Sequence, residues 1–189
     1  VAEQVHHLYP EQVIPIAIHA GGFATPAPSG PFTYDFRTAT GDAYDQFFGI
    51  SGAGNPNGMI NRIDYDSDHI KNHNNWASLC SQIVNEPALA WINLSSSYNS
   101  GTRLAQIDAS VEFLESFTDE MKLVVLLVED SIVKPQTSED QSGSSIVVSD
   151  YVHMHALRAT INSTWGETLG ASSGAVSYTH LRAHETSLH

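Results

Sequence analysis

The sequence predicts an α/β segment followed by an all-β segment. Up to about residue 86, helical and extended patterns alternate along the chain, which is typical of α/β domains. After Pro87 the pattern changes to short runs of alternating apolar and polar residues separated by polar turns, which favours a β-sandwich-like domain. We therefore divide the chain into residues 1–86 and residues 87–173, and the second part need not be a complete domain.

Three helices are predicted in the first part. Residues 1–9 have the spacing of an amphipathic helix that Pro10 ends, and residues 40–48 have an acid in the first turn and Gly49 after the last. Residues 76–85 form the third, which Glu86-Pro87 ends.

Extended segments connect these helices. Residues 13–18 form a short apolar run, predicted as an edge strand because Pro15 has no N–H to donate. After a long loop rich in Pro, Gly and Ser, the residues from Ser51 to Gly58 lead into a second predicted strand, Met59–Ile63, and the bond before Pro56 is a candidate for the cis form.

Four or five strands are predicted after Pro87. They lie near residues 89–94, 104–113, 123–128, 146–148 and 151–161, and residues 134–145 are predicted to be a loop. No helix is expected in this part.

Composition and charge exclude several classes of protein. The 189 residues carry 21 acidic against 8 basic side chains, and the net charge of −13 would repel a phosphate backbone, so no nucleic-acid partner is expected. No apolar run is long enough to span a membrane. Neither a Gly-x-Ser-x-Gly elbow nor a phosphate-binding loop is present, and we expect no cofactor.

Cys80 is the only cysteine in the sequence. It lies on the apolar side of the helix predicted over residues 76–85, where burial keeps a thiol protonated and unreactive. We therefore predict that it packs in a core rather than acting in catalysis.

Both ends of the sequence look foreign or incomplete. Residues 176–186 resemble one reading frame of a sequencing-library adapter, so residues 174–189 are expected to be a non-native tail, although a polar disordered tail is the alternative. At the start, Val1 already lies within the first helix, and the sequence before it is expected to be missing.

Several stretches together resemble the outer membrane protein 28-related family, which comprises thioredoxin-like proteins exported by Gram-negative bacteria. The matching stretches are 13–21, 36–38, 41–44, 56–62, 128–130, 151–158 and 165–166, in this order. The resemblance covers most of residues 1–170. It implies a thioredoxin-like domain over residues 1–86, lacking its first strand and its redox motif, followed by a β-rich domain. It also implies a place in the cell envelope, at the outer membrane or in the periplasm, with membrane attachment only through a lost N-terminal lipid anchor.

The resemblance points to one candidate groove. A cis-proline loop in thioredoxin-like proteins offers backbone groups to an extended peptide, so Pro56, flanked by Asn55 and Asn57, would form such a groove here. A rigid turn that enters a strand is an equally good interpretation of Pro56.

Other polar patterns carry weaker hypotheses. His153 and His155 would share a strand face and are weak metal candidates, as are His69 and His73 on a helix, but no third ligand is evident, so no metal is predicted. Asp64–Asp68 imitates a calcium loop but lacks its glycine and its last glutamate, which favours a solvated acidic turn. Exposed ion pairs are expected for Asp35, Arg37 and Asp42, and for Arg158 with Glu129 and Asp130.

The function expected from these patterns is structural or binding. The chain is interpreted as a non-catalytic piece of an exported envelope protein that has a protein or peptide partner. The first alternative is a thiol-disulfide oxidoreductase whose cysteine motif lies before Val1. The second is a surface module that binds carbohydrate or protein through aromatic side chains, although core packing is the expected role for most of these: Trp91, Tyr98, Tyr151 and Trp165.

Overall fold

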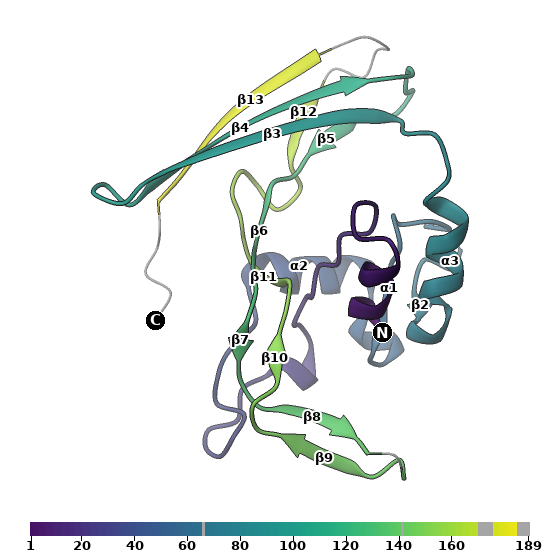
Figure 1. Ribbon diagram of the computed structural model, residues 1–189, viewed down its shortest axis with the longest axis vertical. Coiled ribbons are helices and arrows are strands. Elements are labelled where there is room, and N and C mark those ends of the chain that lie inside the picture. The colour runs from purple at the N-terminus through teal and green to yellow at the C-terminus, as the bar shows by residue number, and fades with distance from the viewer. Residues whose placement is uncertain (66, 141, 170–175, 185–189) are drawn as a thin grey trace. The chain divides into compact units, whose positions relative to one another are not determined.

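The computed structural model describes residues 1–65, 67–140, 142–169 and 176–184 (Figure 1). The chain folds into two compact units, each built from two stretches of sequence. The first unit comprises Val1–Asn85 and Leu127–Ala159, and the second comprises Glu86–Leu126 with the described residues from Thr160 onward. The chain thus leaves the first unit next to the boundary predicted at Pro87 and later returns to it.

The three predicted helices are confirmed in the first unit: α1 (Ala2–Leu8), α2 (Ala39–Phe48) and α3 (Trp76–Ile83). The ends of α2 follow from its sequence. The Thr38 hydroxyl accepts a hydrogen bond from the Gly41 N–H at 2.9 Å, and Gly49 ends the helix with a left-handed φ of 72°. Three short 3₁₀ turns, η1 (Gly22–Ala24), η2 (Ser51–Ala53) and η3 (His73–Asn75), join the remaining segments.

The strands of the first unit are short and form separate pairs. β1 (Asn57–Gly58) pairs with β2 (Lys71–Asn72), and β7 (Ile132–Val133) pairs with β10 (Val152–His153). β8 (Gln136–Glu139) and β9 (Ser145–Val148) form the hairpin seen next to β7 and β10 in Figure 1. β6 (Leu126–Glu129) pairs with β11 (Ala156–Thr160), and most residues of both strands belong to this unit.

Residues 13–18 do not form the predicted strand. Only Ala17 pairs, in one parallel bridge to Ala156, where the Ala17 N–H donates to the His155 carbonyl at 2.8 Å and the Leu157 N–H donates to the Ala17 carbonyl at 2.9 Å. The prediction was wrong beyond that residue because an apolar run does not supply a partner strand, and Ile14 remains 81% exposed.

The strand predicted over Met59–Ile63 is also wrong. Asn61, Arg62 and Asp64 have positive φ angles of 46°, 54° and 55°, so the chain turns where a strand was expected. The strand lies just before, at Asn57–Gly58.

The predicted loop over residues 134–145 contains β8 and the first residue of β9. The Asp140 carboxylate accepts hydrogen bonds from the Ser142 and Ser144 N–H groups, at 2.8 and 2.9 Å, and closes a tight turn between the two strands. The side chains of β8 are polar, so the sequence pattern predicted a loop. The segment is extended because it pairs with β9.

The second unit is built on long antiparallel strands. β4 (Leu104–Phe113), which confirms a predicted strand, lies between β3 (Ala90–Asn99) and β13 (Val176–His184), and β5 (Met121–Leu123) pairs with β12 (Glu167–Leu169). The core gathers around Val111, Phe113 and Leu169, which are at most 9% exposed. Strands of this kind confirm the β-rich character of the chain, whereas the thioredoxin-like character of the first part remains a prediction.

β13 coincides with most of the segment predicted to be a non-native tail. It pairs antiparallel with β4 in one continuous register, from Val176 opposite Glu112 to His184 opposite Leu104. The adapter origin of this segment remains a prediction. Within the described part of the chain, the helices are too short or too polar to cross a bilayer.

Candidate functional site

Residues 54–58, a loop that runs into β1, form the first candidate site, because they include Asn55, Pro56 and Asn57. The Asn55-Pro56 bond is cis, as the sequence suggested, and both residues are exposed. Asn57 is half-buried and turns back onto the loop, where its Nδ2 donates to the Gly54 carbonyl at 2.7 Å and to the Ala53 carbonyl at 3.3 Å. Asn57 therefore braces the loop, whereas Asn55 and Pro56 face solvent.

Two neighbouring elements support this loop. The His73 Nδ1 lies 3.3 Å from the Pro56 carbonyl, and Trp76 donates from Nε1 to the Lys71 carbonyl of β2 at 3.0 Å. A Cβ on Gly58 would lie 3.0 Å from the Trp76 ring, so a larger residue at this position would require that ring to shift by a few tenths of an ångström. The loop is thus held from the β2 side, and β2 is the one strand paired with β1 among the described residues.

The acidic turn after this loop has a structural role. Lys71, which is only 6% exposed as a whole residue, places its Nζ 2.7 Å from Asp64 and 3.2 Å from Asp68. Hydrogen bonding to Asp64, and less strongly to Asp68, raises the pKa of Lys71. The Lys71 ammonium group offsets the negative charge of two carboxylates in this turn. The sequence of the same turn resembles the start of a calcium-binding loop.

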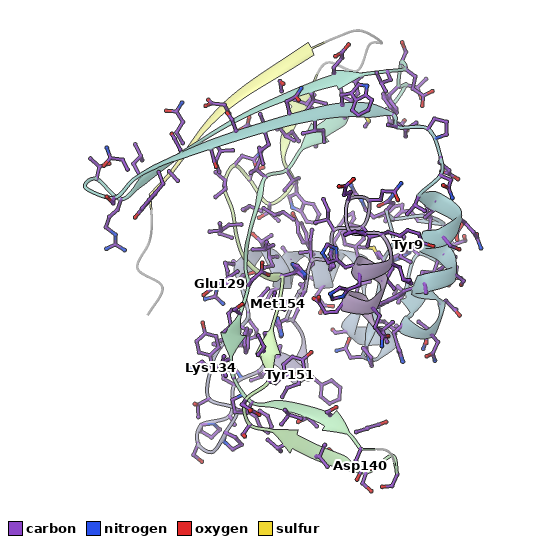
Figure 2. All side chains as sticks on the ribbon, in the orientation of Figure 1. Tyr9, Glu129, Lys134, Asp140, Tyr151 and Met154 are labelled. Atoms are coloured by element: carbon purple, nitrogen blue, oxygen red, sulfur yellow. The ribbon has the colours of Figure 1, made fainter. Side chains whose placement is uncertain are left out.

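A second site, which sequence reasoning missed, is an aromatic cluster in the first unit. We define the His19 cluster as His19, Tyr34, Phe36, His153 and Arg158. Figure 2 labels three residues near it: Glu129 at the end of β6, Lys134 directly after β7, and Tyr151 directly before β10.

Its rings pack closely. His19 stacks on Phe36 with ring centroids 4.5 Å apart, and Phe36 lies 4.4 Å from His153 and 4.7 Å from Tyr34. The segments that meet here are distant in sequence, which explains why no motif revealed them.

Arg158 closes one side of the cluster. Its side chain is 9% exposed, and its guanidinium lies 5.9 Å from the Tyr34 ring centroid, while Lys134 Nζ lies 4.7 Å from the same ring. Its Nε is 3.2 Å from a Glu129 carboxylate oxygen, so the ion pair expected from the sequence is present, but its arginine is buried and not exposed. Asp130, the other expected partner, pairs with His155 instead.

Burial governs the protonation of the two histidines of the cluster. Burial, followed by the charges of His153 and Arg158, lowers the pKa of His19 from 6.5 to about 4. Burial also lowers the pKa of His153, against a smaller opposing contribution from its contact with the Lys134 carbonyl. Both imidazoles are therefore held neutral near pH 7.

His155 belongs to different surroundings from His153. His153 ends β10, whereas His155 precedes β11 and has a left-handed φ of 54°, so the two do not share a strand. The His155 ring lies 3.1 Å from Glu3 of α1 and 3.2 Å from Asp130. Within the described residues, no three histidine, cysteine or acidic side chains are arranged to hold a metal ion.

The other expected pairs are accounted for by local bonds. His69 Nε2 lies 2.9 Å from the Phe48 carbonyl, and His73 contacts the Pro56 carbonyl, so neither is directed at the other. Arg37 binds both carboxylate oxygens of Asp35 at 2.9 Å, while no ion pair to Asp42 is present in the described structure. The Arg37–Asp35 pair is exposed and contributes little to stability.

The four aromatic side chains expected mainly in cores are exposed: Trp91 by 59%, Tyr98 by 53%, Trp165 by 44% and Tyr151 by 42%. They do not form one platform. Trp91 and Tyr98 lie on opposite faces of β3 because they are an odd number of positions apart along the strand, and Tyr151 belongs to the other unit.

Cys80 is buried in α3, at 6% exposure, and burial raises the pKa of its thiol. We expect Cys80 in the folded protein to react with a disulfide reagent at about pH 8 at least ~100-fold more slowly than in the guanidinium-unfolded protein, because the thiol is both covered and protonated. The measurement is stopped-flow absorbance with an aromatic disulfide. Equal rates in the two states would contradict the burial of this thiol.

One of the comparisons with known proteins identifies the family of this chain. Residues 41–185 match a family model described as outer membrane protein Omp28, and the chain belongs to this family. This membership supports a location in the cell envelope, at the outer membrane. The match includes the strand β13. No curated protein matches the chain, and no solved structure matches it.

Proposed function

We propose that this chain is a non-catalytic part of an outer-membrane-associated envelope protein and that it binds an extended peptide at the loop formed by residues 54–58. In this proposal residues 1–86 form a partial thioredoxin-like domain, which the three helices found in the predicted order support. One observation supports the peptide site: Asn55 and Pro56 are exposed while the Asn57 side chain holds the loop in place.

Backbone groups are the recognition elements of such a site. Asn55 and Pro56 are exposed, and β1 has β2 on one side, so an extended peptide can pair along the other side. Because Asn57, His73 and Trp76 hold the loop in place, little conformational entropy is lost on binding.

The thiol chemistry of the chain agrees with a non-catalytic role. Cys80, the single thiol, is covered and has a raised pKa. It is neither exposed nor activated, which are the two properties that a redox nucleophile requires.

Selection from a displayed library of unstructured peptides, with the full chain as bait, tests this proposal. Selected peptides should bind the Asn57→Ala variant at least ~tenfold more weakly. The variant lacks the hydrogen bonds from Asn57 to the Ala53 and Gly54 carbonyls that hold the loop in place. Asn99→Ala is the matched control, since Asn99 braces a different turn, between β3 and β4. Failure to select any peptide, or equal affinity for both variants, would contradict a peptide site at this loop.

A further inference from the structure

Asn57 and Gly58, the two residues of β1, form a dipeptide that is chemically unstable in water. The backbone nitrogen of the residue after an asparagine can attack the asparagine side chain, and glycine presents that nitrogen without a Cβ to obstruct it. Asn57 is the one asparagine in the sequence that a glycine follows. We therefore expect it to be the asparagine of this chain that loses its side-chain nitrogen most readily.

The reaction closes a five-membered ring and then opens it. The Gly58 nitrogen forms a bond to Asn57 Cγ, the bond from Cγ to Nδ2 breaks, and Nδ2 leaves as ammonia with the proton that the Gly58 nitrogen has lost. Water then adds to one of the two carbonyl carbons of the resulting succinimide. One opening yields aspartate. The other yields isoaspartate, in which the main chain runs through the former side chain.

The fold restrains both rotations that ring closure requires. The Gly58 nitrogen reaches Asn57 Cγ only after rotation about the Cα–C and Cα–Cβ bonds of Asn57. Antiparallel pairing of β1 with β2 holds the first bond in an extended conformation. The hydrogen bonds from Asn57 Nδ2 to the Gly54 and Ala53 carbonyls, at 2.7 and 3.3 Å, hold the second bond and also retain the nitrogen that would leave.

Trp76 of α3 covers the same dipeptide. A Cβ on Gly58 would lie 3.0 Å from Trp76 Cζ2, so the indole ring lies against β1. Trp76 Nε1 donates to the Lys71 carbonyl at 3.0 Å and thereby joins α3 to β2. The two strands have two residues each, and so short a pair opens locally at a lower free energy than a core element does. Ring closure becomes possible during such openings.

The products cannot restore the closed loop. A carboxylate at position 57 accepts hydrogen bonds but donates none, so it would face the Gly54 and Ala53 carbonyls without a proton between them. Isoaspartate also lengthens the main chain of β1 by one carbon, which disturbs its register with β2. Either product adds one negative charge to a chain that carries −13.

We propose that Asn57-Gly58 is a modification site, at which the protein deamidates spontaneously whenever β1 opens from β2, and that the reaction permanently releases the loop of residues 54–58. Folding limits the rate of this reaction, and modified loops accumulate as molecules age. Deamidation at this position does not depend on whether the loop binds a peptide.

Peptide mapping by mass spectrometry, during incubation of the full chain at about pH 8, tests the reaction. In the guanidinium-unfolded chain deamidation should be fastest at Asn57, and in the folded protein it should be at least ~tenfold slower there. Trp76→Phe, which keeps a ring beside Gly58 but removes the hydrogen bond to β2, should speed the reaction in the folded protein about fivefold. Trp91→Phe, which alters an exposed tryptophan of the other unit, is the matched control and should react like the parent.

Three outcomes would overturn this modification site. In the first, another asparagine reacts faster than Asn57 in the unfolded chain. In the second, Asn57 reacts at the same rate in the folded and the unfolded parent, a comparison that needs no variant. In the third, Trp76→Phe and Trp91→Phe react at the same rate.

Hydrogen exchange measures the release of the loop. The deamidated protein, which anion-exchange chromatography separates by its additional negative charge, should exchange the amide hydrogens of β1 and β2 at least ~tenfold faster than the parent. Asn57→Asp reproduces the aspartate product without incubation and should show the same change. Asn99→Asp, at a turn of the other unit, is the control and should leave exchange in β1 and β2 unaltered. Unchanged exchange there in both the deamidated protein and Asn57→Asp would show that the reaction does not release the loop.

Discussion

Lowering the pH from about 7 to about 4.5 is expected to destabilise the first unit by about 2.5 kcal/mol through His19 alone. The pKa of His19 is about 4 in the folded protein against 6.5 ordinarily. As the pH falls below about 6.5, His19 binds a proton in the unfolded chain, whereas in the folded protein it stays neutral until about pH 4. The free energy of unfolding therefore falls between these two pH values. His153, whose pKa is also lowered, acts in the same direction.

Urea unfolding of the parent and of His19→Gln at both pH values measures this effect. The variant has no group at position 19 that titrates in this window, so its free energy of unfolding should fall by about 2.5 kcal/mol less than that of the parent. His7→Gln, which removes an exposed histidine, is the control for loss of any imidazole. A pH dependence in His19→Gln equal to that of the parent would show that His19 is not held neutral by burial.

Truncation of Phe113 to alanine is expected to lower the free energy of unfolding of the second unit by about 3–5 kcal/mol. Phe113 is 2% exposed and packs with Val111 and Leu169, and its ring meets that of Phe117 at 5.4 Å. Removing the ring leaves a cavity that these neighbours fill incompletely. Since domains are commonly stable by about 5–15 kcal/mol, this loss is a large part of the total.

Thermal and urea unfolding monitored by circular dichroism test the Phe113 prediction. Phe23→Ala is the matched control, because the Phe23 side chain is 91% exposed and the same atoms are removed. It should change the free energy of unfolding by less than about 0.5 kcal/mol. Similar losses in the two variants would show that Phe113 does not lie in a packed core.

The helices could be predicted from the sequence because their signals are local. Thr38 and Gly49 lie at the two ends of α2, where a hydroxyl accepts from a free N–H and a glycine adopts a left-handed conformation. Each signal acts within one helical turn and needs no knowledge of the rest of the chain.

Strands were predicted less well because pairing is not local. Residues 13–18 form an apolar run of the length of a strand but pair at Ala17 alone, while the polar residues 136–139 form β8 because β9 lies beside them. Extended segments become strands only where a partner lies alongside, and single-sequence patterns do not reveal the partner.

The candidate site shows the same division. The loop at Asn55-Pro56 was proposed from a family resemblance carried by contiguous residues, and the structure adds that the Asn57 side chain braces it. The His19 cluster joins residues 19, 34–36 and 153–158, whose proximity depends on the fold. His153 and His155 were predicted to share a strand face, and this prediction was wrong. The strand β10 ends at His153, and His155 adopts a left-handed conformation.

Peptide binding at the loop before β1 is the central functional claim, and amide chemical shifts measure it most directly. Titration of the isotope-labelled full chain with a selected peptide should move the amide signals of Asn55, Asn57 and Gly58 most, because the peptide pairs along β1. Shifts confined to residues outside this loop and β2, or no shifts at saturating peptide, would contradict the claim.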